Sequence, residues 1–314
     1  MEQLLADTEC LAVNLHQSLA PLSGWDVPVW PAAGSDVGAT PTDDHSREYP
    51  IDDLKDGTQV VCLDPITNQT LRMKGIFSGP LAGYVPSVTI ADGDQTWSLT
   101  ELTDGLADER VKASDLATDV RDALTTYAQG SPLALAAIDP LSLVHGVDDR
   151  GDSGVQLPPL VRSEIQAWDV DILSATGAFG RADERGAPTD SSGHGDGRGG
   201  VIVHGRIQHT ATLDLAGMRA LEEASSGLGT YVHGLALGGL WRGACDYDLR
   251  PGCRLVPNGP ASIEAVYRNG RRTSASLSGA EVGKALLSAS AGARQLELPI
   301  GEQRRGTLVR TDSV

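Results

Sequence analysis

The sequence predicts an α+β protein built on an antiparallel sheet. Alternation of apolar and polar side chains, typical of a half-buried strand, is clearest at residues 201–213. Asn269-Gly270 lies between two strand-like runs and is a strong signal for a β-hairpin. Helical periodicity appears at residues 108–129, and strand and helix patterns do not alternate regularly along the chain. This mixture favours α+β over a doubly wound parallel sheet.

The first 130 residues include a long segment with neither the periodicity of a strand nor that of a helix. Residues 20–57 are rich in Pro, Gly and Asp and are predicted to be extended and loop-like. Short buried strands are expected at 59–63 and 84–90. Apolar side chains recur every three to five positions through 108–129, which predicts one amphipathic helix that ends at Gly130.

Two strands are predicted in the middle of the chain, at residues 141–147 and 157–170, joined by the polar turn 148–154. Because side chains alternate along a strand, two polar or aromatic residues of the second strand, Arg162 and Trp168, share the face opposite the core. Residues 174–200 contain almost nothing apolar and are expected to form a long flexible insertion.

The last third begins with a helix that Asp214 can cap at its N-terminus. Residues 228–241 form a glycine-rich apolar helix or turn. The runs 262–268 and 271–277 flank the predicted hairpin turn. Ser278-Gly279-Ala280-Glu281 has the spacing of a capping box, which predicts the start of the last helix.

Composition and charge exclude several classes of protein. The chain has 314 residues, 40% of them hydrophobic, which is enough for a substantial core. Four scattered cysteines without a CxxC pair do not make a disulfide framework. We find no pattern of a secretion signal or membrane span, so a cytoplasmic protein without membrane contacts is expected.

The net charge of −17 argues at first against a polyanionic partner, but the charge is unevenly placed. Residues 1–160 carry 8 basic and 25 acidic side chains, whereas residues 161–314 carry 17 of each. All but four of the basic residues are arginines, which bind phosphate with a planar, bidentate fork. The neutral second half therefore remains open to a nucleic acid.

No motif in the sequence indicates a binding site for a cofactor or a metal. Gly195-Asp196-Gly197-Arg198-Gly199-Gly200 satisfies GxGxxG, but it follows a loop and precedes a strand, unlike a dinucleotide site. His204 and His209 are five apart on a strand and point to opposite faces, so they cannot share zinc. The aspartates of the turn 148–154 lack the spacing of a calcium loop and read as a solvated turn.

The polar strand faces are the remaining candidate site. Arginine, amide, hydroxyl and aromatic side chains on a sheet can track a sugar-phosphate backbone and stack on bases. Such a face is also what the solvent side of an ordinary sheet looks like. The pattern alone leaves both interpretations open.

One resemblance favours the first interpretation. The run 131–147 (SPLALAAIDPLSLVHGV) is followed by 157–170 (LPPLVRSEIQAWDV), and shorter matches lie at 67–73, 110–124, 199–221 and 247–253. Together these segments resemble the backbone subunit of type I-G (formerly I-U) CRISPR effector complexes of the Cascade kind, a member of the RAMP superfamily. The resemblance covers roughly two thirds of the chain in the expected order.

The resemblance implies a single RAMP-type domain over residues 1–314 with an RRM-like, ferredoxin-like core and long insertions. Residues 1–57 would be an acidic, loop-rich segment, and 174–200 a flexible insertion in the place of a thumb. The chain would bind CRISPR guide RNA, associate with further copies of itself into a filament, contact other subunits, and support pairing of the guide with target DNA in antiviral defence. No bond is broken by such a subunit.

Candidate RNA-binding residues follow from the same resemblance. Asn68, Gln69, Arg72 and Lys74 would lie in the segment that meets the guide, and Arg162 with Ser163 would donate to its phosphates. Arg150 and Arg206 are added on location alone. The alternative for Arg162 is that it only pairs with an acidic neighbour, namely Asp148, Asp149 or Glu164.

Two rival functions remain at this point. The first is a metal-dependent RNA nuclease on the same scaffold, with Asp148, Asp149, Asp152 or Asp169 as the metal-binding carboxylate. The second is an acidic interaction module that binds no nucleic acid. Residues 1–60 match the family poorly and the insertion at 174–200 looks short, so the resemblance does not extend RNA contacts to these two segments.

Overall fold

A computed structural model describes residues 8–19, 51–53, 56–102, 104–173, 200–243, 247–250, 253–257 and 261–309. Within these residues the main sheet has the strand order β12-β13-β1-β11-β8-β3-β2, and β14 and β15 extend it from β1. Its strands are β1 (Thr8–Leu19), β2 (Ile51–Asp53), β3 (Gln59–Asp64), β8 (Val161–Trp168), β11 (Ile207–Asp214), β12 (Tyr247–Arg250), β13 (Cys253–Pro257), β14 (Ser262–Tyr267) and β15 (Arg272–Ala275). All pairs in this sheet are antiparallel.

Four strands of the sheet follow a β-α-β-β-α-β connectivity. Strand β1 is followed by helices before β8, β8 and β11 pair directly, and helices again precede β14. In space the order is β14-β1-β11-β8, with every neighbour antiparallel. The predicted α+β class with an antiparallel sheet is confirmed, and the connectivity is the one expected of a ferredoxin-like core.

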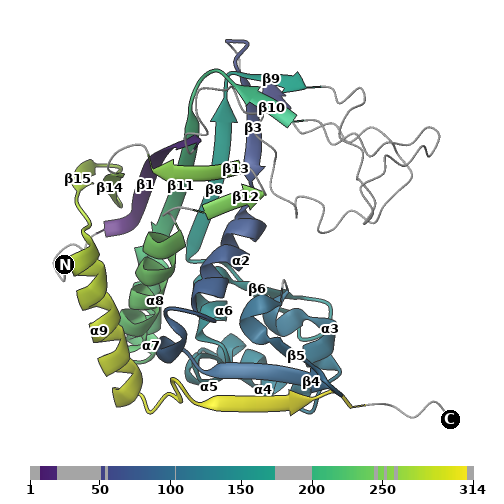
Figure 1. The fold of residues 1–314 in the computed structure, drawn as a ribbon. Coiled ribbons are helices and arrows are strands. Elements are labelled where there is room, and N and C mark those ends of the chain that lie inside the picture. The colour runs from purple at the N-terminus through teal and green to yellow at the C-terminus, as the bar shows by residue number, and fades with distance from the viewer. Residues whose placement is uncertain are drawn as a thin grey trace, which may run out of the picture.

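Helices pack against one end of this sheet (Figure 1). They are α2 (Ile66–Ile76), α3 (Glu109–Lys112), α4 (Ala117–Ala128), α5 (Leu133–Ile138), α6 (Pro140–His145), α7 (Leu215–Ala224), α8 (Leu228–Gly243) and α9 (Gly279–Gln295). Helix α8 is buried on almost every side and lies against α9, α7, α2 and α6. Its sequence is apolar all round, as expected of a central helix. No helix of the described residues is both long and apolar enough to cross a membrane.

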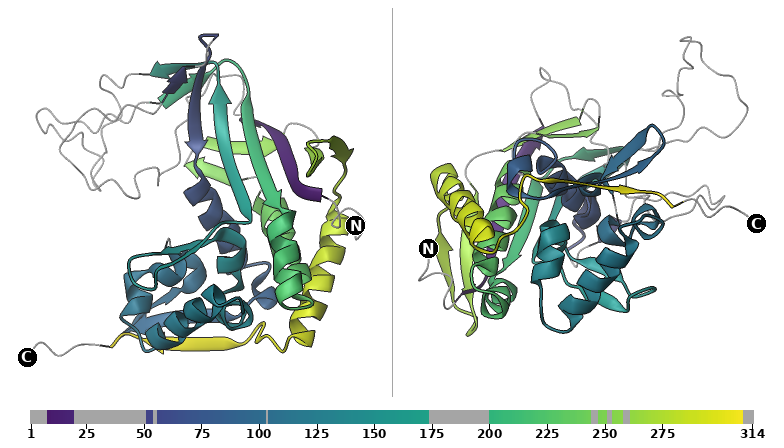
Figure 2. Two further views of the ribbon diagram at one scale, coloured as in Figure 1. Left: turned by 180° about the vertical axis from the view of Figure 1, so that it is seen from behind. Right: turned by 90° about the horizontal axis from the view of Figure 1, so that it is seen from below.

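Smaller sheets complete the molecule. Strands β4 (Ser87–Asp92), β5 (Gln95–Ser98) and β16 (Gln303–Thr307) form one, in which β16 runs parallel to β4. Strands β6 (Val147–Asp149) and β7 (Val155–Leu157) form a hairpin, and β9 (Val170–Leu173) pairs with β10 (Gly200–Val203). Short 3-10 turns lie at Ala82–Tyr84, Leu99–Glu101 and Gly105–Ala107. Figure 2 shows the β4–β5–β16 sheet at the far end of the molecule from β9 and β10.

Apolar side chains cover one face of the main sheet in two clusters. The larger one lies between the helices and the lower end of the sheet. The smaller one contains Ile165, Ala167 and Leu63 together with Leu255 of β13. The β12–β13 hairpin therefore crosses the same face that the helices cover, in front of β11 and β8 in Figure 1 and behind them in the left view of Figure 2.

Four predicted elements are wrong in their type or length. Two of them are the single strands expected at 157–170 and 201–213, which residues 158–160, 169 and 204–206 interrupt. Residues 141–147 were expected to be a strand, but Pro140–His145 is helix α6, and the strand β6 begins only at Val147. Asp139 caps this helix by accepting the Leu141 N–H, and Pro140 occupies the first turn, so the helix-start signal outweighs the apolar run. The helix expected at 108–129 is two helices, α3 and α4, separated at residues 113–116.

Strand β1 was not predicted at all. It pairs with β11 on one side and with β13 and β14 on the other, so it lies in the middle of the main sheet. The expectation of a loop-rich segment over residues 1–57 is therefore wrong for Thr8–Leu19, and Ile51–Asp53 is also a strand. The flexible insertion predicted at 174–200 lies outside the described residues except for Gly200.

Other expectations agree with the structure. The strand at 59–63 is β3, and the strand at 84–90 starts later, at Ser87. Asp214 caps α7 by accepting the Gly217 N–H at 3.0 Å. The hairpin around Asn269-Gly270 is β14–β15, with Gly270 at φ +80°, and Ser278 and Glu281 form the capping box of α9.

Candidate nucleic-acid interface

The face of the main sheet opposite the apolar clusters is polar. On β8 and β11 the register sets Arg162 beside Thr212, Glu164 beside Thr210, and Gln166 beside Gln208. These side chains are partly or fully exposed, whereas the alternate residues of both strands are buried. We call this set, with Trp168 at the end of β8 and Cys62 of β3, the polar sheet face. The alternation predicted from the sequence is confirmed for both strands.

Arg162 is an exposed cation on the polar sheet face. It makes no hydrogen bond or ion pair with any residue that the structure describes. The alternative in which Arg162 pairs with an acidic neighbour is wrong for the two turn residues, because Asp148 pairs with Arg150 and Asp149 with Lys112. Glu164 accepts from Gln166 Nε2 at 3.2 Å instead. The Arg162 guanidinium is thus open to a ligand.

Arg206 and Trp168 form a stack at one end of the polar sheet face. The Arg206 guanidinium carbon lies 4.3 Å from the centre of the Trp168 ring. Arg206 Nε donates to Gln208 Oε1 at 3.1 Å, and the side chain remains exposed. The sequence indicates both residues as candidates but does not predict their contact. The contact depends on the β8–β11 register, in which the Trp168 N–H donates to the Arg206 carbonyl at 2.9 Å.

A buried polar network ties α2 to the sheet beneath this face. Gln69 Nε2 donates to Asp64 Oδ2, and Ser163 Oγ donates to Gln69 Oε1 at 3.0 Å. Ser163 Oγ also lies 2.6 Å from His209 Nε2. Arg72 Nε donates to Asp64 Oδ2 at 2.9 Å, with 28% of its side chain exposed. Arg72 is the member of this network that reaches the surface.

Burial controls the protonation of the network. It raises the pKa of Asp64, against the lowering effects of Arg72 and of the amide hydrogen bonds. It lowers the pKa of His209 to about 4, so the imidazole is neutral at pH 7 and bonds Ser163 without a charge. Ser163 is 2% exposed and Gln69 2%, so neither faces a ligand on the polar sheet face. The expectation that Ser163 donates to phosphate beside Arg162 does not fit this placement.

Asn68 and Lys74 also lie inside the molecule. Asn68 is 7% exposed and Lys74 4%. Lys74 lies close to His145 of α6, whose pKa falls to about 3 because of burial and the nearby ammonium. Both ring nitrogens of His145 are buried without a hydrogen-bond partner in the structure. Of the four α2 residues expected to meet the guide, Arg72 alone has a substantially exposed side chain.

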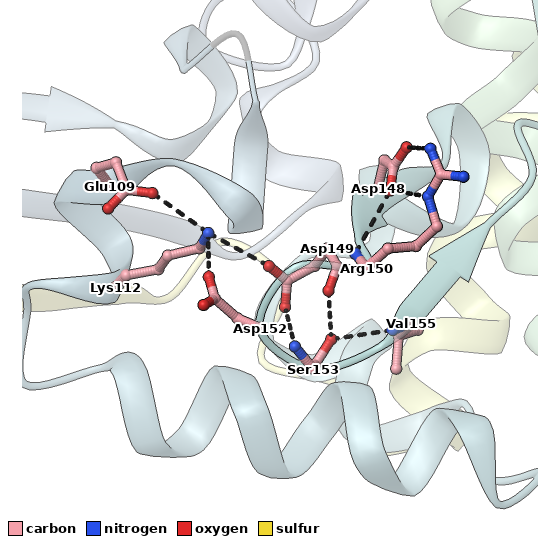
Figure 3. A network of polar contacts seen from close by, with 8 residues as sticks. All are labelled: Glu109, Lys112, Asp148, Asp149, Arg150, Asp152, Ser153 and Val155. Atoms are coloured by element: carbon pink, nitrogen blue, oxygen red, sulfur yellow. Dashed lines mark hydrogen bonds and ion pairs between the residues drawn. The ribbon is translucent and has the colours of Figure 1, made fainter.

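Arg150 and three of the nuclease candidates lie in the β6–β7 hairpin, which is a separate two-stranded sheet and not part of the main sheet (Figure 3). Arg150 donates through Nε and Nη2 to Asp148 at 2.8 and 2.6 Å. Lys112 of α3 pairs with Asp149 at 3.4 Å and also contacts Asp152. Asp169 lies beside β9, at the opposite end of the fold in Figure 1. The four carboxylates therefore do not converge, and the described residues hold no cluster of three or more metal-ligating side chains.

Comparisons with known proteins add the following. The comparison with curated proteins gave no match. A solved structure described as a CRISPR RNA-guided surveillance complex, pre-nicking, aligns with a TM-score of 0.36 and 10% identity, covering 97% of this chain and 94% of that chain. A likeness of this size carries no argument about fold or function. Residues 13–172 match the model of the family described as CRISPR-associated protein GSU0053. Since the match covers more than half of the chain, from β1 to β9, this protein belongs to the CRISPR-associated GSU0053 family.

Proposed function

We propose that the chain is a non-catalytic backbone subunit that binds CRISPR guide RNA within an antiviral effector complex. Several copies would associate along one guide, contact other subunits, and hold the guide for pairing with target DNA. The observation that carries the proposal is the unpaired, exposed Arg162 on the polar sheet face of a CRISPR-associated family member.

The chemistry of the polar sheet face fits a single-stranded RNA. Arg162 supplies a guanidinium for phosphate, and Thr210 and Thr212 supply hydroxyls that can bond phosphate or the 2′-OH. Trp168 and Arg206 add a planar stack for bases. No described helix covers this part of the sheet in the left view of Figure 2.

The non-catalytic part of the proposal is supported by the state of three of the four candidate aspartates, those of the β6–β7 hairpin. Asp148 is held by Arg150, and Asp149 and Asp152 by Lys112, so each carboxylate already has a cationic partner. None of them lies on the polar sheet face. We therefore expect bound RNA to stay intact in Mg²⁺, and cleavage that is lost on Asp148→Asn or Asp169→Asn would favour the nuclease instead.

RNA binding is tested with the full chain and a labelled single-stranded guide RNA over a series of salt concentrations. Arg162→Ala should weaken binding equally for unrelated guide sequences, because phosphate contacts carry no sequence information. The slope of log affinity against log salt should fall by about 0.7, the value for one phosphate contact to a single strand.

Arg304→Ala is the matched control. It removes the same charge, but Arg304 lies on β16 and pairs with Asp119, remote from the polar sheet face. Arg304→Ala should leave affinity and slope unchanged. No RNA binding by the unmodified chain, or equal effects of the two substitutions, would contradict the proposal.

A further inference from the structure

A hollow of about 490 Å³ lies where the polar sheet face ends, at the corner between β8–β9 and β10–β11. Its lining comes from both sides of the corner and from the residues before β3. The lining residues are Asp56, Thr58, Trp168, Asp169, Gly205 and Arg206. This set combines an aromatic ring, a guanidinium and two carboxylates in one place.

The Arg206 guanidinium is held in a fixed plane at the hollow. Trp168 supports one face of it at 4.3 Å, and Gln208 Oε1 accepts from its Nε at 3.1 Å. Arg206 is exposed and lines the hollow, so a planar group that enters the hollow can reach the guanidinium. Fixing the plane in advance reduces the entropy lost when a ligand stacks on it.

The backbone of the corner is also tightly fixed. Asp169 adopts a left-handed conformation with φ +57°, which is uncommon for a residue other than glycine. Its N–H donates to the Gln59 carbonyl at 2.8 Å, and its carbonyl accepts from the His204 N–H at 2.8 Å. A Cβ atom at Gly205 would lie 2.5 Å from the Trp168 carbonyl oxygen, so only glycine fits there. Unusual backbone held this firmly is characteristic of ligand sites.

The polar groups of the hollow favour a neutral planar ligand over a phosphate. Two carboxylates, Asp56 and Asp169, accompany the single guanidinium of Arg206. Carboxylates repel phosphate but accept hydrogen bonds from the N–H groups of a nucleobase. The indole Nε1 of Trp168 is buried and donates to no partner among the residues that the structure describes.

We infer that the hollow binds one unstacked nucleobase of the RNA, which lies on the Arg206 guanidinium and continues the Trp168–Arg206 stack. This inference rests on the proposed function and deepens it. Arg162 takes a phosphate of the backbone, whereas the hollow takes a base, so each copy of the chain makes two chemically different contacts with one strand.

The test compares a single-stranded RNA with an abasic oligomer of the same length, which keeps the sugar-phosphate backbone but has no bases. The unmodified chain should bind the RNA about tenfold more tightly than the abasic oligomer, within the range measured for base stacking on one aromatic platform. Arg206→Lys keeps the charge but replaces the planar guanidinium with an ammonium group. Trp168→Leu removes the indole ring that stacks on the guanidinium. Both substitutions should therefore abolish the preference for RNA over the abasic oligomer.

Arg162→Ala is the matched control and should weaken binding of both oligomers alike. Arg206→Lys and Trp168→Leu are checked for unchanged thermal unfolding, and Arg206→Lys alone decides the result if Trp168→Leu is destabilised. Equal affinity of the unmodified chain for the two oligomers, or a preference that survives Arg206→Lys, would overturn the base site while leaving the proposed function standing. Failure to bind either oligomer would reject both.

Discussion

Three buried histidines make the free energy of unfolding depend on pH in the mildly acidic range. Burial lowers the pKa of His145 to about 3 and those of His209 and His233 to about 4. In the unfolded chain these groups accept protons near pH 6.5. Their stabilising effect is therefore complete above pH 6.5 and is lost as pH falls towards 4. Asp64, whose pKa is raised by burial, acts in the opposite direction.

We predict that the free energy of unfolding falls between pH 6 and pH 5, with each histidine contributing up to about 1.4 kcal/mol per pH unit. His145→Leu should remove the contribution of one histidine, because leucine binds no proton. Neither ring nitrogen of His145 has a hydrogen-bond partner among the described residues, so the substitution breaks no hydrogen bond there. Urea unfolding at several pH values measures the slope. Unfolding of both proteins at pH 7 to 8, where the slope should be near zero, is the control, and an unchanged slope for His145→Leu at pH 5 to 6 would contradict the prediction.

The sequence could indicate which residue types gather at the site but, outside the strands, not which of them reach solvent. Arg162 and Ser163 are neighbours, and strand alternation alone places them on opposite faces. Gln69 looked like a surface residue of an RNA-binding segment, yet it is 2% exposed because α2 turns it towards Asp64 and Ser163. The Trp168–Arg206 stack could not be predicted, since it depends on strand register across a long insertion.

Glycines on α8 let α9 approach closely, and this contact can be tested by adding a single methyl group. A Cβ at Gly234 would lie 2.5 Å from the Ala289 Cβ and 2.7 Å from the Ala285 carbonyl oxygen. Gly234→Ala should lower the free energy of unfolding by about 1–3 kcal/mol, because overpacking outweighs the gain in helix propensity. Chemical denaturation measures the change.

Gly283→Ala on α9 is the matched control. Nothing lies within 4 Å of the position that its Cβ would take. The same substitution should here stabilise the protein by up to about 1 kcal/mol, the difference in helix propensity between alanine and glycine. Stabilisation by both substitutions would show that α8 and α9 are less closely packed than the structure has them.

Lys112 joins α3 to the β6–β7 hairpin (Figure 3). Its ammonium pairs with Asp149, which is 7% exposed, and contacts Asp152 and Glu109. Lys112→Met should cost about 1–3 kcal/mol in the free energy of unfolding, since it leaves the buried Asp149 carboxylate without a cation. Arg150→Ala breaks an ion pair in which both side chains are more than half exposed, so it should lower the free energy of unfolding much less than Lys112→Met does. Urea unfolding of the two variants compares them, and equal costs would be inconsistent with the burial of Asp149.

At the level of elements, local signals worked where they were strong and failed where two signals competed. The Asn269-Gly270 turn and the Ser278–Glu281 capping box were read correctly because each depends on a few adjacent residues. The apolar run that became α6 fits a buried strand or a buried helix equally well by period, and only the Asp139-Pro140 start distinguishes them.

At the scale of the whole molecule, four strands of the nine-stranded main sheet have the connectivity expected of a ferredoxin-like core, with helices and further strands inserted between them. The class could be predicted from mixed periodicities, but the sheet order could not, because β1 pairs with strands about 200 residues away. The alternation of Leu11, Val13 and Leu15 was the signal that could have found β1. The long Pro- and Asp-rich stretch that follows it, which has no such alternation, favours a loop for the region as a whole.

The proposed association of copies along one RNA concerns the whole molecule. A head-to-tail contact between identical subunits leaves each end of the array open to the next copy. We therefore predict that the number of chains bound rises in proportion to RNA length, as measured by the mass of the complexes on a series of oligomers. Ribonuclease treatment should return the protein to its RNA-free mass, and a fixed number of chains on every RNA would contradict the proposed association.

The position of β1 has a consequence for how the chain folds during synthesis. Cys10 pairs with Asp214, and Thr8 with Tyr267, so β1 can form its strand pairs only after most of the protein has left the ribosome. At about 5–20 residues per second this takes roughly 10 to 50 seconds. Throughout that time β1 has both edges unpaired, and an unpaired strand is a template for aggregation. In the nascent chain β1 is therefore open to wrong pairing long before the polar sheet face exists.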